Sequence, residues 1–273
     1  MTKFVLLVTS ILLLGCSTTH DVASRIKHAQ EIATQNNFQM RLINGGDFTL
    51  TTFQRITASH LPFVFYIEGD GHLTDNGIHS NNPTPVNLML LKLATIDKRL
   101  NVVYIARPCQ YTPLEMNSKC ISNYWLDKRM GQEVVDSINN VINIINNGQK
   151  FSLIGFSGGG GLAILIAAQN SDVKDIITIA GNLDTEKFDK YHNYRGYLVK
   201  SLNPINYAKQ VDNIPQLHLS GMDDKKVPPF IAEQYVKTSN SLCVKQYTLP
   251  NISHTKGWDK VWPHILDIPL ICN

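Results

Sequence analysis

The chain has 273 residues, of which 43% are hydrophobic and 17% are charged, and its formal net charge is +3 at neutral pH. This composition excludes a disordered chain, and the length fits one large domain of mixed helices and strands. The small basic excess is spread along the chain with no long basic run, so it indicates neither a nucleic-acid partner nor an acidic one.

The first residues indicate export. Lys3 is followed by an apolar run over residues 4–14, which is too short to span a bilayer as a helix but is typical of a secretory signal. The run leads into Leu-Leu-Gly-Cys, which resembles the bacterial lipobox and implies a lipid on Cys16. Ser17 rather than Asp after that cysteine implies sorting to the outer membrane. An ordinary signal peptide is the alternative.

This leader predicts how the chain is divided. We expect a signal peptide over residues 1–15, a tether and N-terminal segment over residues 16–37, and one folded domain over residues 38–273. The lipid would make the membrane a partner, with the domain in the periplasm or outside the cell.

The remaining four cysteines would then lie in an oxidising compartment, where an even number favours disulfides. Proximity in the sequence favours Cys109–Cys120 and Cys243–Cys272, one of three possible connectivities. No Cys-x-x-Cys or His-x-x-His spacing indicates zinc, so we expect no metal and no cofactor.

Strands alternate with helices after an N-terminal hairpin. Asn-Gly between the alternating segments 38–43 and 48–56 predicts that hairpin. We expect further strands at residues 62–67, 101–106, 151–156, 175–180, 216–220 and 244–249. Helices are expected at residues 86–99, 127–147, 162–168, 229–238 and 258–266, with a polar and aromatic excursion over residues 181–213. This order predicts a mostly parallel sheet with helices on both faces, which binds ligands beyond the carboxyl ends of its strands.

The turn after the strand at residues 151–156 carries Ser157. Gly155 and Gly159 lie two residues before and two after it, and such small residues let a strand and a helix pass closely at a sharp turn. A glycine-rich turn can instead cradle phosphate, but the glycine spacing does not match and Leu162, not Lys, follows the glycines. The turn therefore presents a serine hydroxyl above the sheet as a candidate nucleophile, and a turn needed only for packing is the alternative.

This turn resembles the nucleophile elbow of the α/β-hydrolase fold, and the resemblance covers nearly the whole chain after the leader. It implies an α/β fold with a mostly parallel, eight-stranded type of sheet, and a triad in the chain order serine, acid, histidine. Residues 221–228 resemble the family's Gly-x-x-Asp-x-x-Val-Pro loop and imply Asp224 as the acid. Asp223, and Asp184 one strand earlier, remain alternatives. His254 alone among nine histidines lies between the last strand and the last helix, so it is the expected base.

The resemblance also implies two backbone donors for an oxyanion. One is the N–H of Gly158, directly after the nucleophile; the other is the N–H of Asp70, in the loop where many relatives carry His-Gly. Here that loop reads Glu-Gly-Asp-Gly-His, so Glu68 and Asp70 would place negative charge near an anion unless their side chains turn away.

Two residues near this loop are candidates for substrate contact. They are His72 and Arg107, although for Arg107 an ion pair with Glu68 or Asp70 is the favoured interpretation. His218, inside an apolar strand, is expected to be a core histidine.

Together these residues predict a serine hydrolase of the cell envelope that cleaves a carboxylic ester of a small molecule through an acyl-enzyme. A peptidase or acyltransferase using the same triad is an alternative, and so is a non-catalytic envelope lipoprotein with a binding role. Tyr191, His192, Tyr194 and Tyr197 give the short excursion a polar aromatic character, which disfavours a long-chain lipase.

Overall fold

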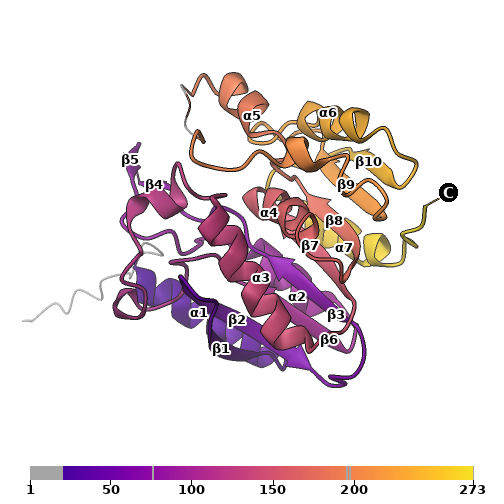
Figure 1. The fold of residues 1–273 in the computed structure, drawn as a ribbon. Coiled ribbons are helices and arrows are strands. Elements are labelled where there is room, and N and C mark those ends of the chain that lie inside the picture. The colour runs from indigo at the N-terminus through magenta and orange to yellow at the C-terminus, as the bar shows by residue number, and fades with distance from the viewer. Residues whose placement is uncertain (1–20, 76, 195, 197, 273) are drawn as a thin grey trace, which may run out of the picture.

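The protein is described by a computed structural model over residues 21–272, apart from residues 76, 195 and 197. Eight strands form one sheet in the order β1-β2-β6-β3-β7-β8-β9-β10 (Figure 1). They are β1 (Gln39–Asn44), β2 (Thr49–Ile56), β3 (Phe63–Ile67), β6 (Asn101–Ile105), β7 (Phe151–Phe156), β8 (Val173–Ile179), β9 (Gln216–Gly221) and β10 (Val244–Leu249). Strand β2 is antiparallel to both neighbours and every other pair is parallel, which confirms the predicted sheet.

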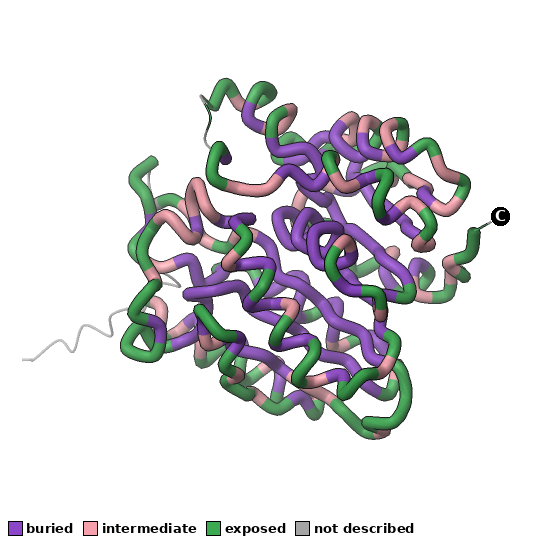
Figure 2. The backbone as a smooth tube through the Cα atoms, in the orientation of Figure 1, coloured by how far each residue is buried: buried purple, intermediate pink, exposed green. Residues whose placement is uncertain are grey.

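Helices cover both faces of the sheet. Buried side chains of α1 (Val22–Gln35), α2 (Met89–Ile96) and α7 (Trp258–Leu266) pack in one hydrophobic cluster. Those of α3 (Gln132–Asn146), α4 (Gly158–Ala167) and α6 (Phe230–Ser239) pack in a second cluster on the other face. Figure 2 shows the central strands buried between these layers, with exposed backbone on the outer sides of the helices. The two apolar faces of the sheet are thus closed by separate helical layers.

Shorter elements complete the chain. The excursion carries α5 (Thr185–Tyr191) and η3 (Pro204–Tyr207), and two more 3-10 helices, η1 (Leu114–Met116) and η2 (Ser122–Trp125), follow β6. A small separate hairpin, β4 (Thr74–Asp75) and β5 (Ile78–His79), was not expected from the sequence because strands of two residues have no readable alternation. No helix in the described residues is both long and apolar enough to cross a bilayer.

Two helices begin later than the sequence predicts. Helix α3 starts at Gln132 rather than at residue 127. The carbonyl of Arg129 accepts a hydrogen bond from the guanidinium of Arg107, and the amide of Met130 donates to Ser201 Oγ at 3.1 Å. These long-range bonds use the backbone groups that a first helical turn would need. Helix α2 begins at Met89 rather than at residue 86. It ends at Ile96, because the backbone is extended at Asp97.

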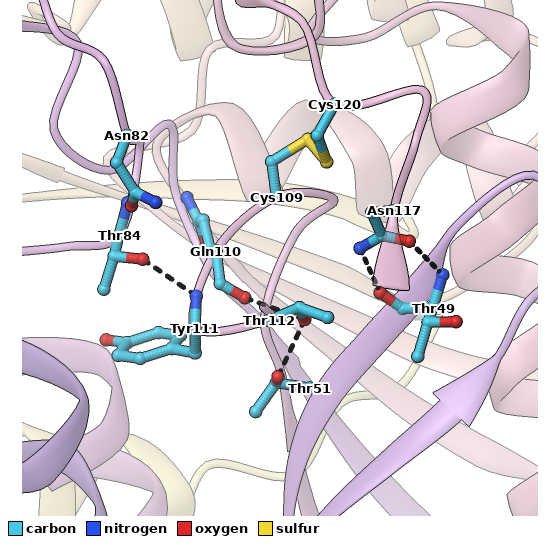
Figure 3. Close-up of a disulfide and its surroundings, with 10 residues drawn as sticks. All are labelled: Thr49, Thr51, Asn82, Thr84, Cys109, Gln110, Tyr111, Thr112, Asn117 and Cys120. Atoms are coloured by element: carbon cyan, nitrogen blue, oxygen red, sulfur yellow. Dashed lines mark hydrogen bonds between the residues drawn. A yellow bond between two sulfur atoms is a disulfide. The ribbon is translucent and has the colours of Figure 1, made fainter. Parts of the chain in front are cut away.

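Both disulfides expected from proximity are present, Cys109–Cys120 and Cys243–Cys272. The first closes the loop after β6, as Figure 3 shows. In that loop the Asn117 amide pairs with both backbone groups of Thr49, at 2.7 and 2.8 Å (Figure 3). The loop is therefore fixed to the edge of the sheet where the parallel strands end. The expected signal peptide and Cys16, the residue expected to carry a lipid, lie outside the described residues.

Candidate active site

Ser157 lies between β7 and α4 with φ 52° and ψ −120°. A non-glycine residue with positive φ is strained by about 1–3 kcal/mol and persists only where the surroundings enforce it. A β-carbon added to Gly155 would overlap the carbonyl of Gly159, and one added to Gly159 would come within 2.5 Å of the Glu68 carbonyl oxygen. Only small residues at these two positions let β7, α4 and the loop after β3 meet, and their approach holds Ser157 in its strained turn.

The proposed acid and base are in contact. His254 Nδ1 lies 2.8 Å from Asp224 Oδ2, although the two residues come from loops after different strands, β10 and β9. The other carboxylate oxygen of Asp224 accepts the amides of Lys226 and Val227 at 2.8 and 2.9 Å, which fixes its orientation. A carboxylate on Nδ1 holds the neutral imidazole with its proton there and leaves Nε2 as the base.

Ser157 and His254 line the same cavity of about 380 Å³. The imidazole packs against the ring of Phe156, the residue before the serine, with 4.9 Å between ring centroids. The cavity lies at the carboxyl ends of the parallel strands, where ligands bind in sheets of this kind. Its walls also include Pro85, Val86, Asn87, Arg129, Phe188, His192, Tyr194 and Lys226.

The alternative acids lie elsewhere. Asp184 caps α5, where its carboxylate accepts the amide of Lys187 at 3.1 Å. Asp223 is exposed, whereas Asp224 is buried. Of the three candidates, Asp224 is the one that the structure places on His254.

Both acidic residues of the loop after β3 are held by neighbours. Asp70 is paired with Arg107 and with Arg129, whose Nε lies 3.0 Å from Asp70 Oδ2. Burial raises the pKa of Asp70, but the two guanidinium groups outweigh it and hold that pKa below its usual value. Burial raises the pKa of Glu68 to about 7, although Glu68 accepts hydrogen bonds from the Tyr104 hydroxyl at 2.6 Å and the Gly69 amide at 2.7 Å.

The two candidates for substrate contact differ in position. His72 lines the cavity. Arg107 is 3% exposed and binds Asp70 and the carbonyl of Arg129, so the ion-pair interpretation holds and a direct substrate contact was the wrong expectation. Arg129, which the sequence did not single out, lines the cavity instead. Its local sequence carries no motif, and only the folded loops bring it to the serine.

Two further histidines have distinct surroundings. His192 lines the cavity and stacks on Tyr194 with 5.2 Å between ring centroids. His218 is buried, lies 2.8 Å from Thr178 Oγ1, and has its pKa lowered to about 3 by burial, as a neutral core histidine should. In the described part of the chain, no group of three His, Cys, Asp or Glu side chains is arranged to hold a metal ion.

Neither a family model nor a curated protein sequence matches the chain. Solved structures do. A 2,6-dihydroxy-pseudo-oxynicotine hydrolase matches with a TM-score of 0.65 at 13% identity, over 92% of this chain and 75% of its own. An esterase from Pyrococcus furiosus matches with a TM-score of 0.61 at 10% identity, over 86% of this chain and 91% of its own. An acylaminoacyl peptidase from Pyrococcus horikoshii matches with a TM-score of 0.57 at 14% identity, over 84% of this chain and 41% of its own.

These likenesses, with the strand order and the turn at Ser157, show that the chain has the α/β-hydrolase fold. Hydrolases that act on different bonds share this fold, so its presence does not fix the substrate.

Proposed function

We propose that this protein is a serine hydrolase that cleaves a carboxylic ester of a small molecule through an acyl-enzyme. The observation that carries the proposal is the pairing of His254 with the buried Asp224, whose carboxylate is held in a fixed orientation. His254 also lines the same cavity as the strained Ser157. A serine hydroxyl is a weak nucleophile until a neighbouring base, itself held by an acid, removes its proton.

In the proposed reaction, Ser157 Oγ attacks the ester carbonyl carbon while His254 Nε2 takes the hydroxyl proton. Asp224 stabilises the imidazolium that forms. The amides of Gly158 and Asp70 donate to the oxyanion of the tetrahedral intermediate. As the intermediate collapses, the carbon–oxygen bond to the alcohol breaks and His254 gives its proton to the leaving oxygen. A water molecule activated by His254 then hydrolyses the acyl-enzyme and restores Ser157.

The local geometry supports these two amides as donors. Gly158 is the first residue of α4, and the first N–H groups of a helix have no partner within it. Among the described residues, the Asp70 amide makes no hydrogen bond. The start of α4 and the loop after β3 lie against each other at the elbow, since a β-carbon on Gly158 would overlap the Asp70 carboxylate.

The choice of an ester rests on the size of the site and on the relatives of the fold. A cavity of about 380 Å³ suits a small-molecule ligand, for which the usual range is about 300–1,000 Å³. An esterase is among the structures that share the fold, and so is a peptidase, which keeps peptide hydrolysis and acyl transfer as alternatives.

Steady-state hydrolysis of 4-nitrophenyl acetate by residues 17–273 tests this proposal. We expect turnover by the wild type and its loss in Ser157→Ala and His254→Ala, while Asp223→Asn, the matched control for Asp224→Asn, retains it. A wild type that folds but hydrolyses neither esters nor peptides, and transfers no acyl group to an acceptor, would contradict the proposal and favour a binding lipoprotein.

We also propose that the domain is tethered to the cell envelope, facing the periplasm or the exterior, through a lipid on Cys16. The lipobox-like Leu-Leu-Gly-Cys supports this location. Incorporation of radiolabelled palmitate into the full chain in a Gram-negative host, beside Cys16→Ala, tests it. Label in the wild type alone is expected, and equal label in both proteins would be the contrary result.

A further inference from the structure

Three buried ionised side chains meet beside the proposed nucleophile. Asp70, after β3, binds Arg107, after β6, and Arg129, which precedes α3. Arg107 also donates to the main-chain carbonyl of Arg129. Side-chain exposure is 4% for Arg107, 1% for Arg129 and 13% for Asp70. One carboxylate thus joins two arginines from different loops into what we call the Arg–Asp–Arg cluster: Arg107, Asp70 and Arg129.

The cluster packs directly on the elbow. A β-carbon on Gly158 would overlap Asp70 Oδ1 and would lie 2.8 Å from Arg107 Nη1. Gly158 and Asp70 are the two residues whose amides are proposed to hold the oxyanion. The side chain of the second donor residue is therefore anchored beside the backbone of the first.

The cluster carries two positive charges and one negative charge. Burying ions costs several kcal/mol each, and replacing a buried ion pair by apolar side chains is often neutral or stabilising, so fold stability alone does not account for it. A net positive charge in a site of low dielectric does, however, favour an anion that forms nearby. Glu68 cancels this charge only in part, because burial raises its pKa to about 7 although the hydrogen bond from Tyr104 favours its ionised form.

We propose that the Arg–Asp–Arg cluster is part of the catalytic machinery, with Arg129 as a positioning residue. The cluster holds the Asp70 amide in line with that of Gly158 and supplies a fixed positive charge that stabilises the oxyanion of the tetrahedral intermediate. Asp70 would otherwise repel that oxyanion, and the two arginines reverse its effect. The inference rests on the proposed hydrolase function.

Arg129→Gln and Arg129→Lys test the proposal. Gln leaves the cluster neutral, whereas Lys keeps its charge. For Arg129→Gln we expect kcat for 4-nitrophenyl acetate to fall by about 30- to 300-fold, in the range seen when an oxyanion donor is removed, with KM changed by less than about 3-fold. For Arg129→Lys we expect kcat within about 5-fold of wild type, because the charge that acts on the transition state remains.

The matched control is Arg99→Gln. Arg99 also pairs with a buried carboxylate, Asp97, through Nε at 3.0 Å, but it precedes β6 and so lies at the opposite end of the sheet from the cavity. Its loss should lower Tm and leave kcat unchanged. A purely structural role for Arg129 would make its variants behave like this control, with Gln and Lys equally affected.

The outcomes separate the inference from the function beneath it. An inactive wild type contradicts the proposed function. An active wild type with an equally active Arg129→Gln overturns only the inference, as does a variant in which KM rises and kcat does not fall. If Arg129→Gln fails to fold, Arg107→Gln keeps the test open, because it also leaves the cluster neutral: the proposal requires kcat to fall by at least about 10-fold.

Discussion

Polar side chains have different surroundings at the two ends of the sheet. At the amino end, Asp97 accepts hydrogen bonds from the Tyr66 hydroxyl at 2.7 Å and from Arg99, and Asn101 binds the backbone of Ala58 through both its side-chain oxygen and its nitrogen. These groups tie loops together. At the carboxyl end, Ser157 is strained and opens on a cavity together with His254.

The difference shows where the fold can support chemistry. At the amino end, polar groups are satisfied by one another and by main chain, as buried groups normally are. At the carboxyl end, the partners of Asp224 and Asp70 restrain their orientation while the cavity stays open to a ligand. Variants at both ends of the sheet test this contrast.

Removal of the proposed nucleophile should have the largest effect. Ser157→Ala is expected to lower kcat by about 10⁶-fold, as loss of a triad serine does in other hydrolases, with little change in Tm because only one oxygen is lost. Activity assays beside thermal melts measure both. A variant that keeps one tenth of the activity would show that the carboxyl end does not work through this serine.

Crowding at the elbow should be the next largest effect. Gly159→Ala is expected to destabilise the protein by about 3 kcal/mol or more, since its β-carbon has to displace main chain at Ile67 and Glu68. Gly148→Ala is the matched control, because that glycine has φ 75° but nothing within 4 Å of an added β-carbon. It should cost about 1 kcal/mol from backbone strain alone. Urea denaturation of both variants makes the comparison, and equal losses would contradict it.

Glu68 at the carboxyl end and Asp97 at the amino end should respond to pH in opposite directions. Burial raises the pKa of Glu68 to about 7, so its contribution to stability is present below pH 4.5 and is lost as the pH rises through 7. The pKa of Asp97 is lowered, because the Arg99 contacts outweigh burial, so its contribution is present above its usual value and is lost as the pH falls.

In the wild type, ionisation of Glu68 should lower the free energy of unfolding by about 3 kcal/mol between pH 4.5 and pH 7, and Glu68→Gln should abolish this decrease. Asp97→Asn should abolish only the decrease that protonation of Asp97 causes at acid pH. The free energy of unfolding measured in urea across that range tests the Glu68 variant, and the same measurement below pH 3.8 tests Asp97→Asn. Parallel profiles for wild type and Glu68→Gln would show that Glu68 titrates as an ordinary surface carboxyl.

The two disulfides extend the comparison with the smallest expected change in activity. Each should stabilise the fold by about 3–4 kcal/mol, given sequence separations of 11 and 29 residues. Replacing Cys109 and Cys120 by serine should also reduce activity, because their loop leads from Arg107. Replacing Cys243 and Cys272, next to the start of β10, should lower only Tm. An equal loss of activity in both double variants would argue against this difference.

Local patterns predicted much of this structure. The apolar run of β7, the serine and the flanking glycines lie within nine residues, so the elbow can be read from the sequence. The bounds of α7, Trp258–Leu266, are those predicted, because its apolar spacing is regular. The pairing of all four remaining cysteines followed from their proximity.

Features set by distant partners could not be predicted. The start of α3 depends on a bond from Arg107, 22 residues away. The Arg–Asp–Arg cluster depends on three loops meeting at Asp70, and nothing near Arg129 in the sequence signals that contact. The choice of Asp224 over Asp223 came from a resemblance, and only the folded loops show which carboxylate reaches His254.

The most direct test of the central claim, that His254 activates Ser157, is peptide mapping by mass spectrometry after labelling with a fluorophosphonate. The account predicts a single adduct, on Ser157, that forms in the wild type and is lost in His254→Ala. An adduct on another residue, or labelling of His254→Ala at the wild-type rate, would contradict it.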